Sequence, residues 1–149
     1  MKKTLALLIA CSLAAVACGG SESGDDMDMD DMPMAGVRHT VSITQPADGS
    51  TVTGPAVTVQ LATNVPIVQA GDMTPGTGHH HLFLDGDLSP AGVPVPTVPG
   101  AVVHMGNGAS EFTFDAVAPG RHRLIAVVAD GAHVPLAPPV VDTVFFTVQ

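Results

Sequence analysis

The sequence predicts an all-β fold, an antiparallel β-sandwich that follows a signal peptide and a disordered tether. The chain has 16 glycines and 13 prolines and lacks Trp and Tyr, a composition that favours short strands joined by tight turns. Apolar and polar residues alternate in several short segments, as expected of half-buried strands. No segment keeps a helical period, and prolines interrupt most candidate helices. A length of 149 residues has room for one such domain.

Residues 1–18 have the three parts of a secretory signal peptide. Lys2 and Lys3 give a positive start, an apolar run follows, and small residues end the segment. The apolar run is too short to span a bilayer comfortably. Its end, Ala15-Val16-Ala17-Cys18-Gly19, resembles the lipobox of bacterial lipoproteins. This resemblance implies that Cys18 is lipidated and becomes the first mature residue. We therefore expect an exported protein, anchored by lipid in the bacterial cell envelope and facing the periplasm or the cell surface.

Residues 19–38 have the composition of a disordered tether between the anchor and the domain, because few of them can form a core. Met and Asp alternate within the tether, from Asp25 to Met34. Thioethers prefer Cu(I) or Ag(I), whereas carboxylates hold Cu(II) only loosely. The run therefore has two interpretations, a low-affinity metal-binding segment or a solvated acidic spacer.

Two alternating segments open the domain, which we place at residues 39–149. The first segment, 41–44, is followed by Pro46-Ala47-Asp48-Gly49, a typical turn sequence. The second segment, 56–62, puts its valines and a leucine on one face and alanine, threonine and glutamine on the other. Both patterns are typical of strands with one buried face.

The third expected strand, 79–84, contains three consecutive histidines and lies between turn-forming stretches. Because side chains alternate along a strand, His79 and His81 share one face with Phe83, and His80 shares the other face with the leucines. Imidazoles at positions i and i+2 stand roughly 7 Å apart at Cα, close enough to reach one metal ion. The run is internal, so an expression tag does not explain it.

Three further strands complete the predicted sandwich. The segment 112–114 follows a Gly-Asn-Gly loop, Pro119-Gly120 turns the chain into the long segment 121–129, and the segment 143–148 closes the domain.

The segment 87–110, between the third and fourth expected strands, is rich in proline, and Val and Pro alternate at 93–96. Such a composition favours an extended, stiff arm. The outward residues of the expected strands 79–84 and 121–129 would form an apolar patch larger than is usual on a soluble monomer. We expect the arm to cover this patch and to bring His104 and Met105 towards the outward histidines. A His–Met pair would favour copper over zinc. The patch residues are Phe83, Ile125 and Val127.

The charge balance argues against nucleic acid as a partner. The formal net charge is −9, and both lysines lie within the signal peptide, so three arginines remain against 14 acidic residues. Binding to nucleic acid requires a basic surface that displaces counterions. An acidic surface is compatible with attraction of cations, and solubility alone would also explain the acidity.

Several turn and strand ends resemble the small immunoglobulin-like domains of bacterial exported proteins. These are the opening Pro46/Asp48/Gly49, the strand end Asp85-Gly86, the turn Pro119-Gly120 and the strand end Asp130. The resemblance covers roughly residues 40–149 and implies an immunoglobulin-like sandwich.

A narrower resemblance is to an uncharacterised bacterial family of domains of unknown function. It is based on Gly76-Thr77-Gly78-His79-His80-His81-Leu82, on His104 before a Gly-rich loop, on Pro119-Gly120-Arg121-His122, and on Asp130-Gly131-Ala132-His133-Val134-Pro135. Members often have a further His where this chain has Leu136-Ala137. The resemblance implies a fold and no reaction.

The histidines outside the core are expected to meet at one end of the sandwich. In an immunoglobulin-like domain the strand 79–84 pairs antiparallel with the strand 121–129. The start of one then lies beside the end of the other. Imidazole and carboxylate are both ligands of zinc and copper, and Asp130 has a second interpretation as a residue that orients a ligating imidazole. The alternative is a metal-free hydrogen-bond network that braces loops. The candidate ligands are His79, His81, His133, His104 and Asp130.

The remaining histidines have structural explanations. We expect His80 to be a buried, hydrogen-bonded core residue. His122 follows a Pro-Gly turn where such sandwiches often place a Tyr that bonds back to the corner, and we expect the same bond here. His39, at the edge of the tether, has no assigned role.

The sequence favours a metal-binding lipoprotein that holds copper or zinc through neutral imidazoles and releases the ion on protonation. The alternative is a structural or adhesive immunoglobulin-like interaction module without metal, whose partner is a protein or a glycan. An enzyme is not expected, because neither a nucleophile with its base nor a pair of catalytic carboxylates is evident.

Overall fold

Strands alone make up the regular secondary structure of residues 37–149, the part of the chain that the computed structural model describes. The predicted signal peptide, the lipidation of Cys18 and the Met/Asp run fall outside these residues. No helix within 37–149 is long and apolar enough to cross a membrane. The strands are β1 (Val41–Gln45), β2 (Thr51–Val52), β3 (Val57–Thr63), β4 (His79–Leu84), β5 (Val102–Met105), β6 (Glu111–Phe114), β7 (Gly120–Ala129) and β8 (Val141–Val148).

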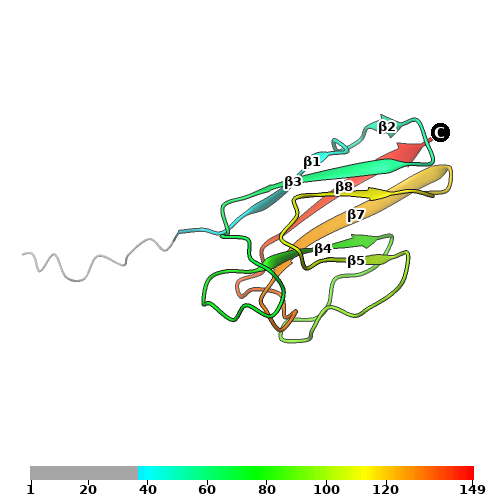
Figure 1. Ribbon diagram of the computed structural model, residues 1–149. Helices are drawn as coiled ribbons and strands as arrows, with labels where there is room; N and C mark the ends of the chain where they lie inside the picture. Colours follow the sequence, from blue (N-terminus) through cyan, green and yellow to red (C-terminus); the bar gives the residue numbers. More distant parts are fainter. Residues whose placement is uncertain (1–36) are drawn as a thin grey trace, which may run out of the picture. The chain divides into compact units, whose positions relative to one another are not determined.

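Two sheets form the sandwich (Figure 1). The first sheet has the order β1-β3-β6, and the second has the order β2-β8-β7-β4-β5. In an immunoglobulin domain the corresponding strands are A-B-E in one sheet and G-F-C in the other. The prediction of an immunoglobulin-like β-sandwich is therefore confirmed, including the antiparallel pairing of β4 with β7.

The main core lies between the sheets and follows the alternation of the sequence. In β3 the inward valines at 57 and 59 are fully buried, and Thr58 between them is exposed. Leu82, Leu124 and Phe146 face them from the second sheet and are also buried. All six expected strands are present, with ends within about two residues of the expected ones, which is the usual uncertainty of strand ends.

The arm after β4 covers the outer face of the second sheet, as predicted. Phe83, Ile125 and Val127 form a separate buried cluster, and Val95 and Val102 pack against it. The arm returns as β5, which pairs with β4 at the edge of the sheet (Figure 1). This strand was not predicted, because its four residues follow a proline-rich stretch and have no alternation long enough to recognise.

Two histidines support the fold as expected. His80 is buried, and its Nδ1 donates to the carbonyl of Ala109 at 3.0 Å. The ring of His122 lies between Asp85 Oδ2 at 2.7 Å from Nδ1 and the Ala118 carbonyl at 2.8 Å from Nε2. Burial lowers the pKa of His122, but the bonds to these acceptors outweigh it, and the pKa is raised. Both interactions are satisfied only when the ring is protonated.

Candidate metal centre

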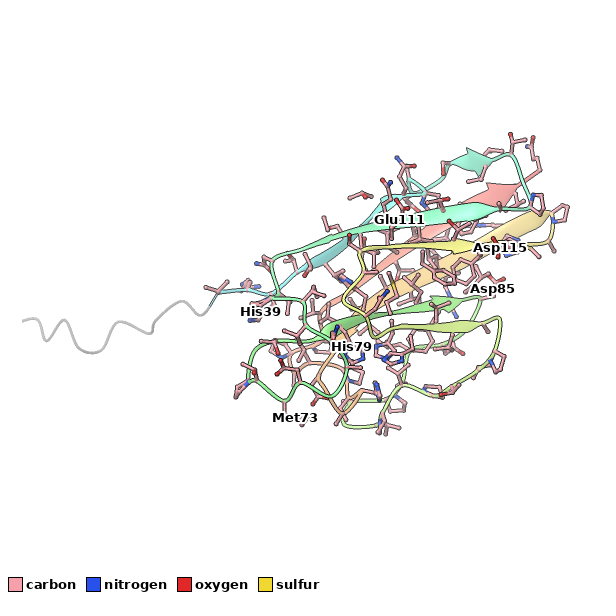
Figure 2. All side chains as sticks on the ribbon, in the orientation of Figure 1. His39, Met73, His79, Asp85, Glu111 and Asp115 are labelled. Atoms are coloured by element: carbon pink, nitrogen blue, oxygen red, sulfur yellow. The ribbon has the colours of Figure 1, made fainter. Side chains whose placement is uncertain are left out.

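His79 and His81 lie at the start of β4, on the face that points away from the main core. His79 pairs with Ala129 on β7, and His81 lies directly between Val127 on β7 and His104 on β5. Figure 2 shows His79 where β4 begins and Asp85 at the opposite end of that strand. The strand alternation predicted from the sequence therefore puts two imidazoles at one end of the second sheet.

Gly78 allows β4 to begin close to the end of β7. A Cβ atom at position 78 would lie 2.5 Å from the Ala129 carbonyl oxygen, a distance that side chains do not tolerate. Glycine at this position therefore places His79 next to β7 and near the loop that follows it.

The loop after β7 positions His133. The backbone of His133 has a φ of 66°, and its amide donates to the Asp130 carbonyl at 2.9 Å. The Asp130 side chain accepts from the amides of Ala132 and Val134 through the same oxygen, Oδ1, at 2.9 Å each. Asp130 thus shapes the loop that presents His133, and it is not one of the side chains whose ligand atoms cluster there.

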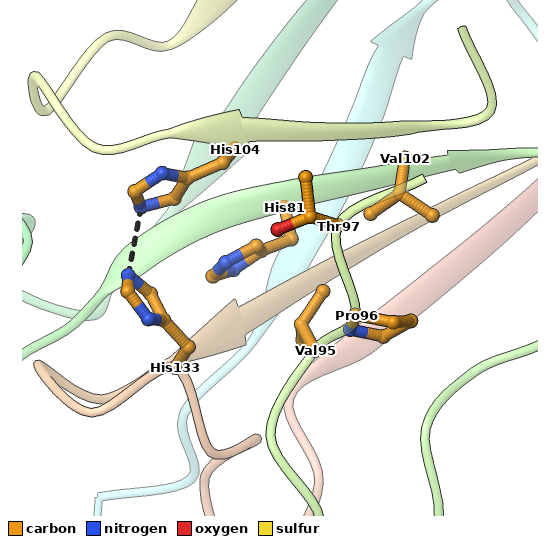
Figure 3. Close-up of a pocket in the computed structure, with 7 residues that line it drawn as sticks. All are labelled: His81, Val95, Pro96, Thr97, Val102, His104 and His133. Atoms are coloured by element: carbon orange, nitrogen blue, oxygen red, sulfur yellow. Dashed lines mark hydrogen bonds between the residues drawn. The ribbon is translucent and has the colours of Figure 1, made fainter. Parts of the chain in front are cut away.

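Four imidazoles meet at this end of the sheet. One nitrogen of each ring lies within 4.8 Å of one nitrogen of every other ring. His104 Nε2 and His133 Nε2 are 3.0 Å apart, and one donates a hydrogen bond to the other (Figure 3). The ring centroids of His79 and His81 are 4.7 Å apart. These are His79, His81, His104 and His133, all of which the sequence predicts as ligands.

The spacing is close to what a shared ion requires. A tetrahedral zinc ion lies about 2.0–2.1 Å from each imidazole nitrogen, which separates the nitrogens by roughly 3.3 Å. The observed nitrogen separations reach at most 4.8 Å, so side-chain movements of about an ångström would bring the four nitrogens to the spacing of a shared ion.

The buried half of the cluster lacks hydrogen-bond partners. His79 is 0% exposed and His81 is 2% exposed. Neither nitrogen of His79 has a hydrogen-bond partner in the described structure, and Nδ1 of His81 has none either. A buried polar atom without a partner costs about 1–3 kcal/mol. His80 Nε2 also lacks a partner, but His79 and His81 bring three such nitrogens together in the cluster, and this concentration needs an explanation. A metal ion would take the lone pairs that remain unused.

Electrostatics keep these rings neutral. Burial, followed by repulsion from His104 and His133, lowers the pKa of His79 to about 4. Burial, and to a smaller extent repulsion from His79, lowers the pKa of His81 to about 3. The pKa of His104 is also lowered, by burial and by His133. Near neutral pH the lone pairs of these imidazoles are available, and an arriving ion has few protons to displace.

The prediction that Met105 joins His104 at the site is wrong. Adjacent residues of a strand face opposite sides, and Met105 pairs with His80 on β4 and is buried in the main core. The cluster therefore contains nitrogen donors, and the thioether that would favour copper over zinc points away from it.

Two features of the site were not predicted. The amide of Val95, on the arm, donates to the His133 carbonyl at 2.8 Å, which ties the arm to the ligand loop. A Cβ atom at position 106 would lie 2.6 Å from the His104 ring, so Gly106 leaves the space that this ring occupies. The Gly directly after His104-Met105 was the available sequence signal for the second feature.

Fold and site together define an immunoglobulin-like β-sandwich with a four-histidine cluster, at one end of a sheet, that could hold a metal ion. The chain belongs to a family described as a domain of unknown function (DUF4399), which matches residues 57–149. The match begins at β3 and includes all four histidines of the cluster. The expectation of an uncharacterised family of this kind is confirmed.

Two solved structures are similar to this chain at low identity. One is an endo-beta-1,4-mannanase from Thermotoga petrophila, with a TM-score of 0.44, and the other is an engineered protein, with a TM-score of 0.42. Each shares 16% identity over 75% of this chain and 20% of the other chain, so this chain spans about a fifth of their length. No curated protein matches the chain.

Proposed function

We propose that this protein is a cell-envelope lipoprotein that binds one copper or zinc ion through His79, His81, His104 and His133. The observation that carries the proposal is the convergence of four imidazoles from three separate parts of the chain: β4, β5 and the loop after β7. Imidazole is a ligand of both metals, and four of them form a complete tetrahedral set.

A metal-free bracing network explains the cluster less well. A network that braces loops would pair its nitrogens with donors and acceptors, as His122 does. In the cluster the one ring-to-ring hydrogen bond joins His104 to His133, and His79 is left without a partner among the described residues. Keeping such rings buried costs stability, which a bound ion would offset.

The donor set favours divalent ions over Cu(I). All four donors are imidazole nitrogens, and the soft thioether of Met105 is turned into the core. Imidazole suits zinc and Cu(II), and Cu(II) binds more tightly than Zn(II) at a given nitrogen site. Four protein ligands are typical of sites that hold a metal, whereas catalytic zinc sites usually have three. We therefore propose capture and holding of the ion rather than catalysis.

The envelope location is supported by the sequence of residues 1–18, with its basic start, apolar run and Cys18 in a lipobox-like setting. We expect the expressed protein to incorporate labelled fatty acid and to sediment with membranes. The variant Cys18→Ser should incorporate none. Equal labelling of the wild-type and variant proteins would contradict the lipid anchor.

Metal uptake is the direct test of the site. Protein stripped with a chelator, reloaded with Cu(II) or Zn(II) and desalted is expected to retain one ion per chain by elemental mass spectrometry. The double variant His79→Leu/His81→Leu should retain none, because it removes half of the ligands and leaves apolar side chains of similar size.

His39→Ala is the matched control, since His39 is exposed and lies outside the cluster. The His39→Ala variant should retain one metal ion per chain, as the wild-type protein does. Loss of binding in the control, or retention in the double variant, would place the ion elsewhere. Ions held by the Met/Asp run are expected to be lost on desalting, because carboxylates hold Cu(II) only loosely.

A further inference from the structure

A small cavity adjoins the four-histidine cluster. Its volume is about 60 Å³, and it lies between the cluster and the arm (Figure 3). Three of the four proposed ligands line it, and His79 does not, so the cavity lies to one side of the cluster. The lining residues are His81, His104, His133, Val95, Pro96, Thr97 and Val102.

The volume of the cavity limits it to a small species. A buried water requires about 10–15 Å³ of such volume, so 60 Å³ has room for a species of a few atoms. The arm forms the outer wall and is held to the ligand loop by the 2.8 Å bond between the Val95 amide and the His133 carbonyl. Side chains of valine and proline make most of this wall apolar.

The charge of the occupied metal site determines which kind of species the cavity favours. Four neutral imidazoles leave the full charge of a divalent ion uncompensated, and an uncompensated charge in a partly buried site is costly. Asp130 is the carboxylate whose charge acts on His79, but its Oδ1 already accepts two backbone amides of its own loop. An anion bound beside the metal ion would reduce the remaining charge.

We propose that this cavity binds a small inorganic anion of one to three atoms, which coordinates a bound Cu(II) ion as an additional, exogenous ligand, since a tetragonal Cu(II) site has positions beyond its four nitrogens whereas four imidazoles complete a tetrahedral zinc site. The inference depends on the proposed function, because the anion binds to the metal ion. The hydroxyl of Thr97 is the polar group on the arm side of the cavity, and in Figure 3 its oxygen points towards the His81 ring. A hydroxyl there can donate a hydrogen bond to the anion.

Azide is a suitable probe, because it is a linear three-atom anion and gives a charge-transfer absorption band when it binds Cu(II). Titrating the Cu(II)-loaded protein with azide should produce a saturable near-ultraviolet band and a change in the copper electron paramagnetic resonance spectrum. The variant Val95→Phe fills the cavity, and its azide affinity should fall by roughly tenfold or more while copper remains bound. Val93→Phe is the control, because Val93 belongs to the same segment but is exposed and does not line the cavity.

A second variant tests the cavity without a larger side chain that would disturb the arm. Thr97→Val keeps the size of the side chain and removes the hydroxyl, so azide binding should weaken while copper content stays at one ion per chain. A copper-loaded wild-type protein that shows no response to azide overturns this inference and leaves the proposed function standing. An azide response that neither cavity variant alters also overturns it. Absence of bound copper overturns the proposed function, and this inference with it.

Discussion

Lowering the pH from about 7 to about 4.5 is expected to cost the metal-free protein several kcal/mol of unfolding free energy. The cause is the pair of buried imidazoles at the start of β4. Burial lowers the pKa of His79 to about 4 and that of His81 to about 3, whereas in the unfolded chain both have the ordinary value of 6.5. Below pH 6.5 the unfolded chain therefore binds protons that the folded protein does not bind.

The sign follows from this difference in bound protons. Stability rises with pH wherever the unfolded state binds more protons, so each of these histidines destabilises the folded protein as pH falls from 6.5 towards its own lowered pKa. The slope is about 1.4 kcal/mol per pH unit for each fully buried ring. The lowered pKa values of His80 and His104 act in the same direction.

The other groups with shifted pKa values change the unfolding free energy little between pH 6.5 and pH 4.5. The pKa of His122 is raised in the folded protein, so the contribution of this residue to stability is complete below pH 6.5, the pKa in the unfolded chain. This contribution is lost as the pH rises through the pKa of the folded protein. The lowered pKa of Asp85, caused by hydrogen bonds from Arg123 and His122 that outweigh the effect of burial, matters only below about pH 4. The change between pH 6.5 and 4.5 therefore reports on the cluster and on His80.

Urea unfolding followed by far-ultraviolet circular dichroism measures the effect, since the chain has no Trp or Tyr for fluorescence. Metal-free protein should show a midpoint that falls steeply below pH 6.5. Saturating Zn(II) should delay this fall, because protons must then displace the ion. A flat profile in the metal-free protein would mean that the buried rings are solvated or paired in solution, contrary to the structure.

Local alternation in the sequence was sufficient to predict most of the fold. In β3 and β7 the period of two separates the residues that face the main core from those that do not, and turn residues mark the ends. The same alternation, combined with the antiparallel pairing of β4 and β7, placed His79, His81 and His133 together. His104 followed from a packing argument, because the apolar patch around Phe83 needed a cover.

What could not be predicted depends on contacts between distant segments. β5 exists because β4 offers it an edge, and its four residues do not alternate long enough to identify a strand alone. Its register decides that His104 faces the cluster and Met105 the core, and a shift of one residue would exchange them. Likewise, the role of Asp130 is visible only in the structure of the loop after β7, where its Oδ1 accepts hydrogen bonds from two backbone amides.

Replacing His79 and His81 by Leu is expected to stabilise the metal-free protein while it abolishes metal binding. Three nitrogens of these two rings are buried without a partner, and each such atom costs about 1–3 kcal/mol. Leucine has a similar size and no polar atom, so the double variant should gain a few kcal/mol at pH 7 and should lose most of the acid sensitivity. The measurement is the urea midpoint of metal-free wild-type and variant proteins at pH 7 and pH 5.

His80→Leu is the comparison variant, because His80 is buried on the same strand and donates to the Ala109 carbonyl through Nδ1, whereas its Nε2 has no partner among the described residues. Replacing His80 leaves the carbonyl without its donor and also removes the unpartnered Nε2, so the two effects oppose each other and the stability should change less than in the variant at 79 and 81. If the Leu pair at 79 and 81 proves destabilising, the two rings contribute to folding without a metal ion, and the bracing network becomes the better explanation. A gain in stability for the Leu pair that exceeds any change in His80→Leu would instead show that His79 and His81 reduce the stability of the metal-free fold, as expected of residues kept for a ligand.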